Sequence, residues 1–275
     1  MCATCGCGDP NGVRVIDPAA DGHGHGHGHA HDHAHPHDHE HGSHSHLAQP
    51  DPKVVQLELD VLAKNDHLAE RNRDWLAGHG ILALNLMSSP GSGKTTLLER
   101  TVRDLAGELP ISVLEGDQET LLDADRIGST GARVVQINTG AGCHLDADMV
   151  KNGLETLDPA DKSVVFVENV GNLVCPALFD IGESGRVVIM SVTEGADKPL
   201  KYPHMFRTAD LMLVNKVDLL PYVDFDVARC IDYARRANPN VEVLEISATK
   251  GDGMDAWYSW LRERLADVVQ HDEVR

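Results

Sequence analysis

The chain has 275 residues, of which 41% are hydrophobic and only 4% aromatic, so it can bury a sizeable and mainly aliphatic core. Its formal net charge is -19, which argues against nucleic-acid binding, because a phosphate backbone requires clustered positive charge. The sequence lacks the pattern of a secretory signal, and its apolar runs are far too short to span a bilayer, so we expect a cytoplasmic protein without membrane contact.

Residues 1–52 form a compositional unit of their own, in which almost nothing can build a core. We expect this N-terminal region to be disordered on its own and to precede one folded domain over residues 53–275. The region opens with Cys2, Cys5 and Cys7, three thiols that can wrap one soft or borderline ion. Zn²⁺ and Ni²⁺ both fit, and planar thiolate-rich coordination would favour nickel.

A histidine tract lies between residues 23 and 46, where 12 of 24 residues are histidine. Imidazole binds nickel, copper, zinc and cobalt, and many modest sites of this kind indicate a metal store rather than a selective centre. An expression tag is the alternative, but a tag is usually an uninterrupted run at one end of a chain. The histidines are His23, His25, His27, His29, His31, His33, His35, His37, His39, His41, His44 and His46.

The rest of the chain alternates helical and strand patterns. Residues 54–78 carry apolar side chains at helical spacing and end in glycine, which predicts an amphipathic helix. Amphipathic segments such as residues 95–105 and 225–237 separate most of the seven strands that follow. This order predicts an α/β fold, with a mostly parallel sheet flanked by helices on both faces. The expected strands span residues 81–87, 111–115, 133–138, 163–168, 186–192, 210–215 and 241–246.

The sequence SSPGSGKTT after the first of these strands predicts a phosphate-binding loop. Ser88 stands where the usual pattern has glycine, but Gly93, Lys94 and Thr95 match it, and the strand–loop–helix context disfavours a chance glycine-rich turn. Glycines let backbone N–H groups surround phosphate oxygens, Lys94 can reach the β- and γ-phosphates, and Thr95 can bind Mg²⁺. The expected nucleotide contacts are Pro90, Gly91, Ser92, Gly93, Lys94, Thr95 and Thr96.

A second motif, NKVD, predicts which nucleotide binds. Asp218 can accept hydrogen bonds from guanine N1–H and from its exocyclic amine, neither of which adenine has. Because an unpaired buried acceptor costs roughly 1–3 kcal/mol, the motif favours GTP over ATP. Lys216 can lie over the base, and Asn215 can tie this loop either to the phosphate loop or to the base. Backbone N–H groups of a later segment can reach guanine O6, and these belong to Ser247, Ala248 and Thr249.

Two carboxylates follow strand ends and are expected beside the phosphates. Asp117 comes after the second strand and Glu168 ends the fourth, and the carboxyl ends of parallel strands share one edge. Either carboxylate can bind Mg²⁺ together with Thr95, or position the attacking water beside Lys94. The alternative is that both residues are solvated loop carboxylates without a role in catalysis. The sequence shows no evident arginine finger, so we expect slow intrinsic GTP hydrolysis.

A third set of metal-binding residue types lies within the GTPase domain. Cys143, His144 and Cys175 all follow strand ends on the expected nucleotide edge and can ligate Ni²⁺ or Zn²⁺. Adjacent residues in a strand or helix point in divergent directions, so Cys143 and His144 should occupy a loop. The alternative is a buried structural cysteine beside a helix-capping histidine. Cys230 falls on an amphipathic segment and is expected in the core.

Together these motifs resemble the HypB hydrogenase nickel-incorporation GTPases, over nearly the whole chain. The resemblance rests on CATCGC, the histidine tract, SSPGSGKTT, GDQET, QINTGAGCHLDADM, ENVGNLVCP, TEGADKPLKYP and NKVDLL. It implies a SIMIBI-class phosphate-loop GTPase that dimerises with nucleotide and delivers Ni²⁺ to the [NiFe]-hydrogenase large subunit, with a HypA-like nickel chaperone as partner. By this resemblance, Cys143, His144 and Cys175 form a metal site at the dimer interface, and the N-terminal cysteines form a nickel site.

Two other functions remain open at this point. Urease nickel-insertion GTPases share the class, but they typically show Cys-Pro-His where this chain reads Cys-His-Leu-Asp. A nickel storage protein with a vestigial GTPase is the other, and the intact Lys94 and Asp218 argue against it.

The sequence also predicts a coupling between nucleotide and metal. Because Glu168 and Cys175 share one short segment, we expect a bound γ-phosphate to alter the geometry of the metal ligands.

Overall fold

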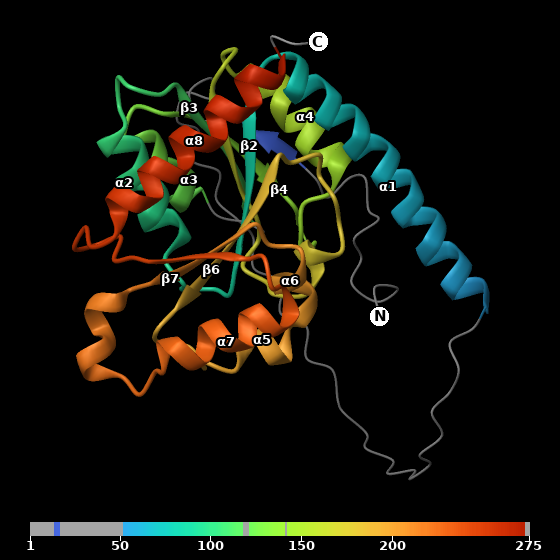
Figure 1. The fold of residues 1–275 in the computed structure, drawn as a ribbon. Helices are drawn as coiled ribbons and strands as arrows, with labels where there is room; N and C mark the ends of the chain where they lie inside the picture. The colour runs from blue at the N-terminus through green and yellow to red at the C-terminus, as the bar shows by residue number, and fades with distance from the viewer. Residues whose placement is uncertain (1–13, 17–51, 118–120, 141, 273–275) are drawn as a thin grey trace, which may run out of the picture.

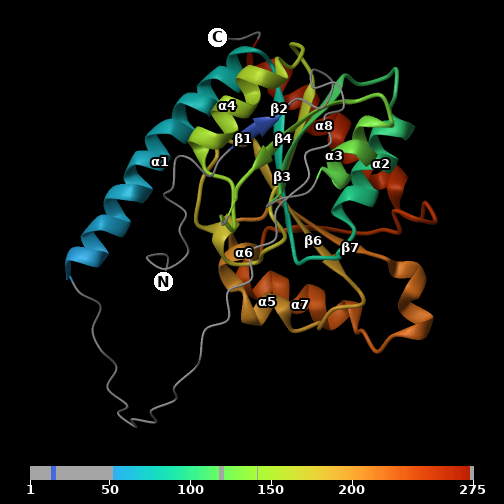
Figure 2. The same cartoon turned by 180° about the vertical axis from the view of Figure 1, so that it is seen from behind.

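The structure, a computed structural model, describes residues 14–16, 52–117, 121–140 and 142–272. One eight-stranded sheet lies between layers of helices (Figures 1 and 2). Its strands are β1 (Arg14–Ile16), β2 (Leu82–Ser88), β3 (Ile111–Asp117), β4 (Arg133–Asn138), β5 (Val164–Glu168), β6 (Gly185–Ser191), β7 (Leu211–Asn215) and β8 (Glu242–Glu245). The α-helices are α1 (Pro52–Gly78), α2 (Lys94–Asp104), α3 (Leu122–Gly128), α4 (Ala147–Leu157), α5 (Lys198–Lys201), α6 (Pro203–Arg207), α7 (Val227–Ala237) and α8 (Met254–Asp272), with 3₁₀ helices η2 (Cys175–Ala177) and η3 (Val217–Tyr222).

The strand order is β1-β4-β3-β5-β2-β6-β7-β8, and every neighbouring pair from β4 to β8 is parallel. This confirms the predicted mostly parallel sheet. Strand β2, which leads into the phosphate loop, lies in the middle between β5 and β6. Because the strands run in one direction, their carboxyl ends collect at one edge of the sheet. There Glu115 of β3 and Glu168 of β5 are partners in register.

Strand β1 is the exception, because it pairs antiparallel with β4 at the edge of the sheet, with Val15 opposite Ile137. The sequence predicts no strand before residue 52, and this is wrong for these three residues. A segment so short carries no periodicity, and it gains its order by pairing with the exposed edge of β4. The predicted N-terminal cysteine site and histidine tract lie outside the described residues.

Side chains that alternate along the strands give the sheet two apolar faces. Leu82 and Leu84 pack in a cluster with α2, α3 and α8, whereas Ala83 faces α1 and α4. Helices α6 and α7 extend the second face over β6 and β7. Burial of one large aliphatic side chain contributes about 1.5–3 kcal/mol, so these clusters dominate the stability of the fold. The core is mainly aliphatic, as expected, although α8 adds Trp257 and Trp260, whose rings stack at 5.6 Å.

Helix α1 ends at the predicted glycines and turns directly into β2. Gly80 has φ +62, a left-handed conformation that favours glycine. The N–H groups of His79 and Ile81 both donate to the carbonyl oxygen of Leu76, at 3.2 and 2.9 Å. These bonds satisfy the helix end and bring the chain back to the sheet within three residues.

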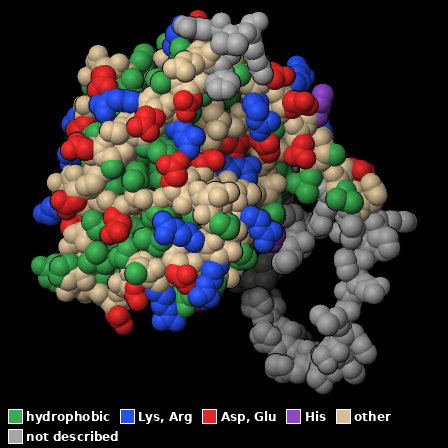
Figure 3. Space-filling model, viewed as in Figure 1, with side chains coloured by type: hydrophobic (Ala, Val, Ile, Leu, Met, Phe, Trp, Pro, Cys, Tyr) green, Lys and Arg blue, Asp and Glu red, His purple; other side chains and the backbone are tan. Residues whose placement is uncertain are grey.

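No helix in the described part of the chain is long and apolar enough to cross a membrane. On the face drawn in Figure 3, Lys and Arg side chains are interspersed with Asp and Glu.

Candidate nucleotide and metal sites

The loop between β2 and α2 lines a cavity of about 580 Å³ at the carboxyl edge of the sheet. Gly91 and Gly93 have φ +74 and +100, where side chains are strained. Gly93 also has no room for a side chain, because a Cβ there would lie 2.6 Å from Asn215 Nδ2. That amide donates to the carbonyl oxygen of Ser92 at 2.9 Å. Of the two partners expected for Asn215, the structure therefore shows the phosphate loop.

Lys94 lies buried at the base of this cavity. Its Nζ donates to Ser88 Oγ at 2.8 Å, and the Ser88 hydroxyl donates onward to the carbonyl oxygen of Ser89 at 2.7 Å. Burial lowers the pKa of Lys94, while the nearby Glu168 carboxylate opposes this shift. A buried ammonium bonded to a hydroxyl gains most from an anionic ligand, so the position suits a phosphate oxygen.

Four carboxylates line the cavity: the expected Asp117 and Glu168, together with Glu115 and Asp123. Thr95 Oγ1 donates to Glu168 Oε1 at 3.0 Å. Glu115 and Glu168 are 3% and 4% exposed, and the Oε2 atom of each has no hydrogen-bond partner among the described residues. Burial is the main cause that raises the pKa of Glu115 to about 9 and that of Glu168 to about 7. Carboxylate and hydroxyl oxygens are hard donors, so this set fits Mg²⁺.

Several residues of the cavity are not singled out by the sequence motifs. Glu115 interrupts an apolar strand two residues before Asp117, and this spacing was the available signal that both point to one side of the sheet. Arg126 of α3 also lines the cavity, although no arginine was evident there from the sequence. It is paired with Glu99 at 2.7 Å and with Asp123 at 3.2 Å. An arginine is thus present at the rim, but two carboxylates hold it.

The predicted base-binding residues lie at the ends of β7 and β8, and they are Asn215, Lys216, Asp218, Ser247, Ala248 and Thr249. The Ala248 N–H donates to Asn215 Oδ1 at 3.2 Å, and Ser247 Oγ donates to Asp218 Oδ1 at 2.6 Å. Lys216 lines the cavity and donates from Nζ to the carbonyl oxygen of Gly91 at 2.6 Å. The two loops are therefore joined to each other and to the phosphate loop.

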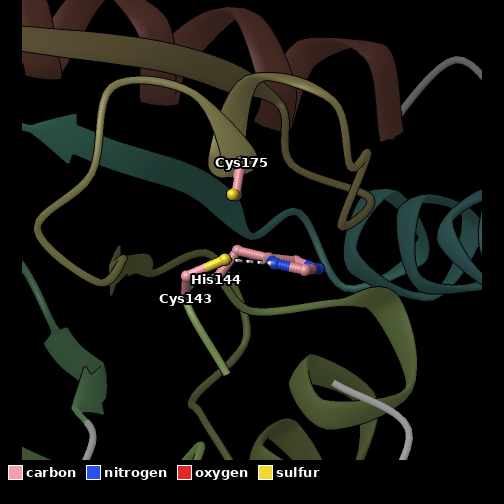
Figure 4. Close-up of side chains that lie close together, drawn as sticks. All are labelled: Cys143, His144 and Cys175. Atoms are coloured by element: carbon pink, nitrogen blue, oxygen red, sulfur yellow. Dashed lines mark hydrogen bonds between the residues drawn. The ribbon is translucent and has the colours of Figure 1, made fainter. Parts of the chain in front are cut away.

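Cys143, His144 and Cys175 come together beside this edge, with one ligand atom of each within 4.8 Å of the others. Cys143 and His144 occupy a loop between β4 and α4, as predicted, and Cys175 begins η2. Figure 4 shows the Cys175 sulfur directed toward the other two side chains, and Cys143 Sγ lies 3.6 Å from His144 Nδ1. Two sulfurs and an imidazole form a donor set that suits Ni²⁺ or Zn²⁺.

The surroundings of His144 are compatible with a metal ligand and exclude the helix-capping role. Its ring is buried and stacks on Phe179 with centroids 3.9 Å apart. Burial lowers the pKa of His144, which favours the neutral imidazole that metals require. The cap of α4 is Asp146, which accepts from the Met149 N–H at 2.8 Å, so His144 is not the capping residue. Cys230, by contrast, is buried in α7 as expected, and burial raises its pKa to about 12.

Comparison with known proteins gives consistent matches. Residues 82–245 match the CobW/HypB/UreG nucleotide-binding domain. The hydrogenase maturation factor HypB of Escherichia coli K12 is 57% identical over 209 residues, which cover 76% of this chain and 72% of that protein. HypB of Rhizobium leguminosarum bv. viciae is 57% identical over 214 residues, 78% and 72% of the two chains.

Two solved structures share the fold. HypB from Archaeoglobus fulgidus has a TM-score of 0.70 at 42% identity, covering 74% of this chain and all of that one. HypB from Helicobacter pylori in complex with nickel has a TM-score of 0.70 at 35% identity, covering 74% and 96%.

Proposed function

The chain belongs to the HypB family of hydrogenase maturation factors, which are phosphate-loop GTPases of the CobW/HypB/UreG group, and from this we propose that it is a nickel metallochaperone. It hydrolyses GTP to drive insertion of Ni²⁺ into the large subunit of [NiFe]-hydrogenase. The observation that carries the proposal is the cluster of Cys143, His144 and Cys175 at the same sheet edge as the nucleotide cavity. A nickel complex of the Helicobacter pylori relative supports nickel as the cargo.

In this account the phosphate loop from Pro90 to Thr96 holds the GTP phosphates, and Asp218 reads guanine while Ser247–Thr249 face its O6. Lys94 neutralises phosphate charge. Mg²⁺, when bound, would be held by Thr95, Asp117 and Glu168, and it supplies further neutralisation of that charge. The remaining carboxylate oxygens orient the attacking water. The geometry of the cavity supports these roles, because Glu168 Oε1 accepts from the Thr95 hydroxyl and Glu168 Oε2 has no hydrogen-bond partner among the described residues.

Three protein ligands leave a further coordination position at the Cys143–His144–Cys175 cluster, as a site for transfer requires. Val174 and Leu178 flank Cys175 and are 50% and 48% exposed. Exposed apolar side chains beside a metal site are typical of a surface that another protein covers. Here the covering protein is a second copy of the chain, in a nucleotide-dependent homodimer. Zn²⁺ is the competing ion, and a HypA-like chaperone is the expected partner in nickel exchange.

The N-terminal region completes the proposal as a cytoplasmic nickel reserve. Cys2, Cys5 and Cys7 bind one nickel ion, and the histidine tract stores several more. Deletion of residues 23–46 is expected to lower the nickel capacity measured by equilibrium dialysis, while hydrogenase maturation persists in nickel-replete cells. Loss of maturation under those conditions would show that the tract takes part in delivery.

The proposal is tested by complementing a host that lacks its own copy of this factor. The wild-type chain should restore nickel to the hydrogenase large subunit, whereas Lys94→Ala and Cys143→Ser should each fail. Phosphate release from GTP should be lost in Lys94→Ala and retained in Cys143→Ser. Wild-type turnover no higher than that of Lys94→Ala would instead favour nickel storage with an idle GTPase.

A further inference from the structure

One buried residue, Asn169, connects the nucleotide cavity to the loop that carries the metal ligands. It is 1% exposed, directly follows Glu168 and lines the cavity. Its backbone N–H donates to the carbonyl oxygen of Leu86 at 3.0 Å, which continues the pairing of β5 with β2. Its Oδ1 accepts from the N–H of Leu145, the residue after the histidine ligand, at 3.1 Å. Asn169 therefore lies at the wall of the cavity, while its side-chain amide bonds to protein groups that include the metal loop.

A chain of hydrogen bonds through Asn85 and Glu183 fixes the orientation of the Asn169 amide. Its Nδ2 donates to Asn85 Oδ1 at 3.1 Å, and Asn85 Nδ2 donates to Glu183 Oε1 at 3.3 Å. Arg186 Nε also donates to this carboxylate oxygen, at 2.5 Å. A flipped amide would place its NH₂ against the Leu145 N–H and lose the bond to Asn85, so the acceptor stays directed at Leu145.

Leu145 makes a second contact with the cavity wall. Its side chain is fully buried against Gly116, where a Cβ would lie only 2.8 Å from Leu145 Cδ1. Gly116 lies on β3 between Glu115 and Asp117, so Leu145 packs on the backbone of a carboxylate-bearing strand end. Leu145, the residue after His144, thus packs on β3 and bonds to the residue that directly follows β5.

The end of the metal loop that leads into α4 is held by hydrogen bonds from residues outside the nucleotide cavity. Asn65 of α1 accepts from the Ala147 N–H at 2.9 Å and donates to the carbonyl oxygen of Asp180 at 2.7 Å. It is buried like Asn169, but it does not line the cavity. Asn72 of α1, also buried, donates to the carbonyl oxygen of the same Ala147 at 2.8 Å. The loop is therefore held on one side by Asn169, which lines the nucleotide cavity, and on the other by Asn65 and Asn72, which do not.

We propose that Asn169 is the positioning residue through which the bound nucleotide sets the geometry of the Cys143 and His144 ligands. The inference rests on the proposed GTP-dependent nickel delivery. A shift of Glu168 on nucleotide exchange moves Asn169, and the Leu145 N–H follows, because separation would leave this buried donor unpaired, whereas Asn169 Oδ1 would keep only its bond from the Val170 N–H. Since coupling is reciprocal, bound nickel changes the preference for GTP over GDP by the same factor.

The test uses the full-length chain with Cys2, Cys5 and Cys7 replaced by serine, so that thiolate-to-nickel absorption reports the interior site. Ni²⁺ is titrated in a chelator buffer with Mg²⁺ and either GDP or a non-hydrolysable GTP analogue, and Cys143→Ser provides the blank. The measured quantity is the ratio of the two nickel affinities. We expect at least about fivefold for the wild-type site, the lower end of typical allosteric coupling.

Asn169→Ala should bring this ratio to within about twofold of unity while GDP affinity is retained. Asn169→Ser keeps a polar group but is too short to reach Leu145, so it should behave in the same way. Asn65→Ala is the matched control, which should weaken nickel binding with both nucleotides and preserve the ratio. Mant-GDP fluorescence measures the reciprocal effect of nickel in each variant.

Each failure has its own meaning. A wild-type ratio near unity overturns GTP-gated delivery itself, and this inference with it. A wild-type ratio that survives in both Asn169 variants overturns only the role of Asn169. A ratio abolished equally by Asn65→Ala assigns the effect to general loosening of the loop, and loss of GDP binding in both Asn169 variants makes the residue structural. Both of these last two results contradict the proposal that Asn169 couples the two sites.

Discussion

Replacement of Glu115 with glutamine isolates the charge that this carboxyl brings to the nucleotide cavity. Its Oε2 is buried and has no hydrogen-bond partner within the described part of the chain, and Glu168 is its partner in register on β5. Burial first, and then the charges of Glu168 and Asp117, raise the pKa of Glu115 from 4.5 to about 9. Glutamine has nearly the same shape and cannot ionise, so the substitution removes the charge without opening a cavity.

The sign of the effect follows from proton linkage. Because folding raises the pKa of Glu115, the native protein binds this proton more tightly than the unfolded chain between pH 4.5 and about 9. Wild-type stability therefore falls as pH rises through that window, and the glutamine variant lacks this loss. Water in the open cavity relieves part of the penalty, so we expect the variant to be more stable by about 1–3 kcal/mol near pH 8.5 and equal near pH 5.

Thermal unfolding of the full chain, without nucleotide or divalent cations, measures this difference. For a protein of this size about 1 kcal/mol corresponds to roughly 2–4 °C in Tm, so Glu115→Gln should unfold about 2–12 °C higher near pH 8.5. The histidine tract titrates alike in both proteins and cancels in the comparison. Glu245→Gln, an exposed change on β8, should shift Tm at neither pH. A Glu115→Gln shift of equal size at both pH values would refute the reasoning.

Three further predictions concern guanine recognition, the phosphate loop and the core. Asp218→Asn should weaken GTP binding about 10- to 100-fold and admit xanthosine triphosphate, whose O2 can accept from the new amide; unchanged binding of a fluorescent GTP analogue would exclude Asp218 as the guanine reader. Gly93→Ala should abolish GDP binding in calorimetry, whereas Gly131→Ala, with a similar φ of +92 but open space, should retain it. Trp257→Phe should reduce the urea unfolding free energy by about 1–3 kcal/mol, because it loses packing and the bond from Nε1 to Thr101 Oγ1; a loss below about 0.5 kcal/mol would contradict this.

Features whose geometry is local could be predicted from the sequence. The phosphate loop and NKVD place their chemistry within a few consecutive residues, and alternating apolar runs locate every parallel strand to within two residues. Strand β4 has the predicted bounds, whereas β2 spans residues 82–88 rather than 81–87. Cys143, His144 and Cys175 could be proposed together because each follows a strand that ends at the same edge.

Features that depend on strand order could not be predicted. Glu115 becomes a partner of Glu168 only because β3 lies beside β5, and no local pattern encodes that neighbour. Asn169 is informative only once Leu145 is known to donate to it from another loop. Strand β1 exists because β4 offers an edge, and its three residues alone have no signal.

The central claim is that GTP hydrolysis releases nickel from the Cys143–His144–Cys175 cluster. The most direct measurement loads this cluster with nickel in the full-length chain carrying serine at Cys2, Cys5 and Cys7, adds GTP, and follows nickel and phosphate release together in one time course. The account predicts the same rate constant for both, and no release with a non-hydrolysable analogue. Nickel that leaves without regard to nucleotide, or that stays bound while phosphate is released, would contradict it.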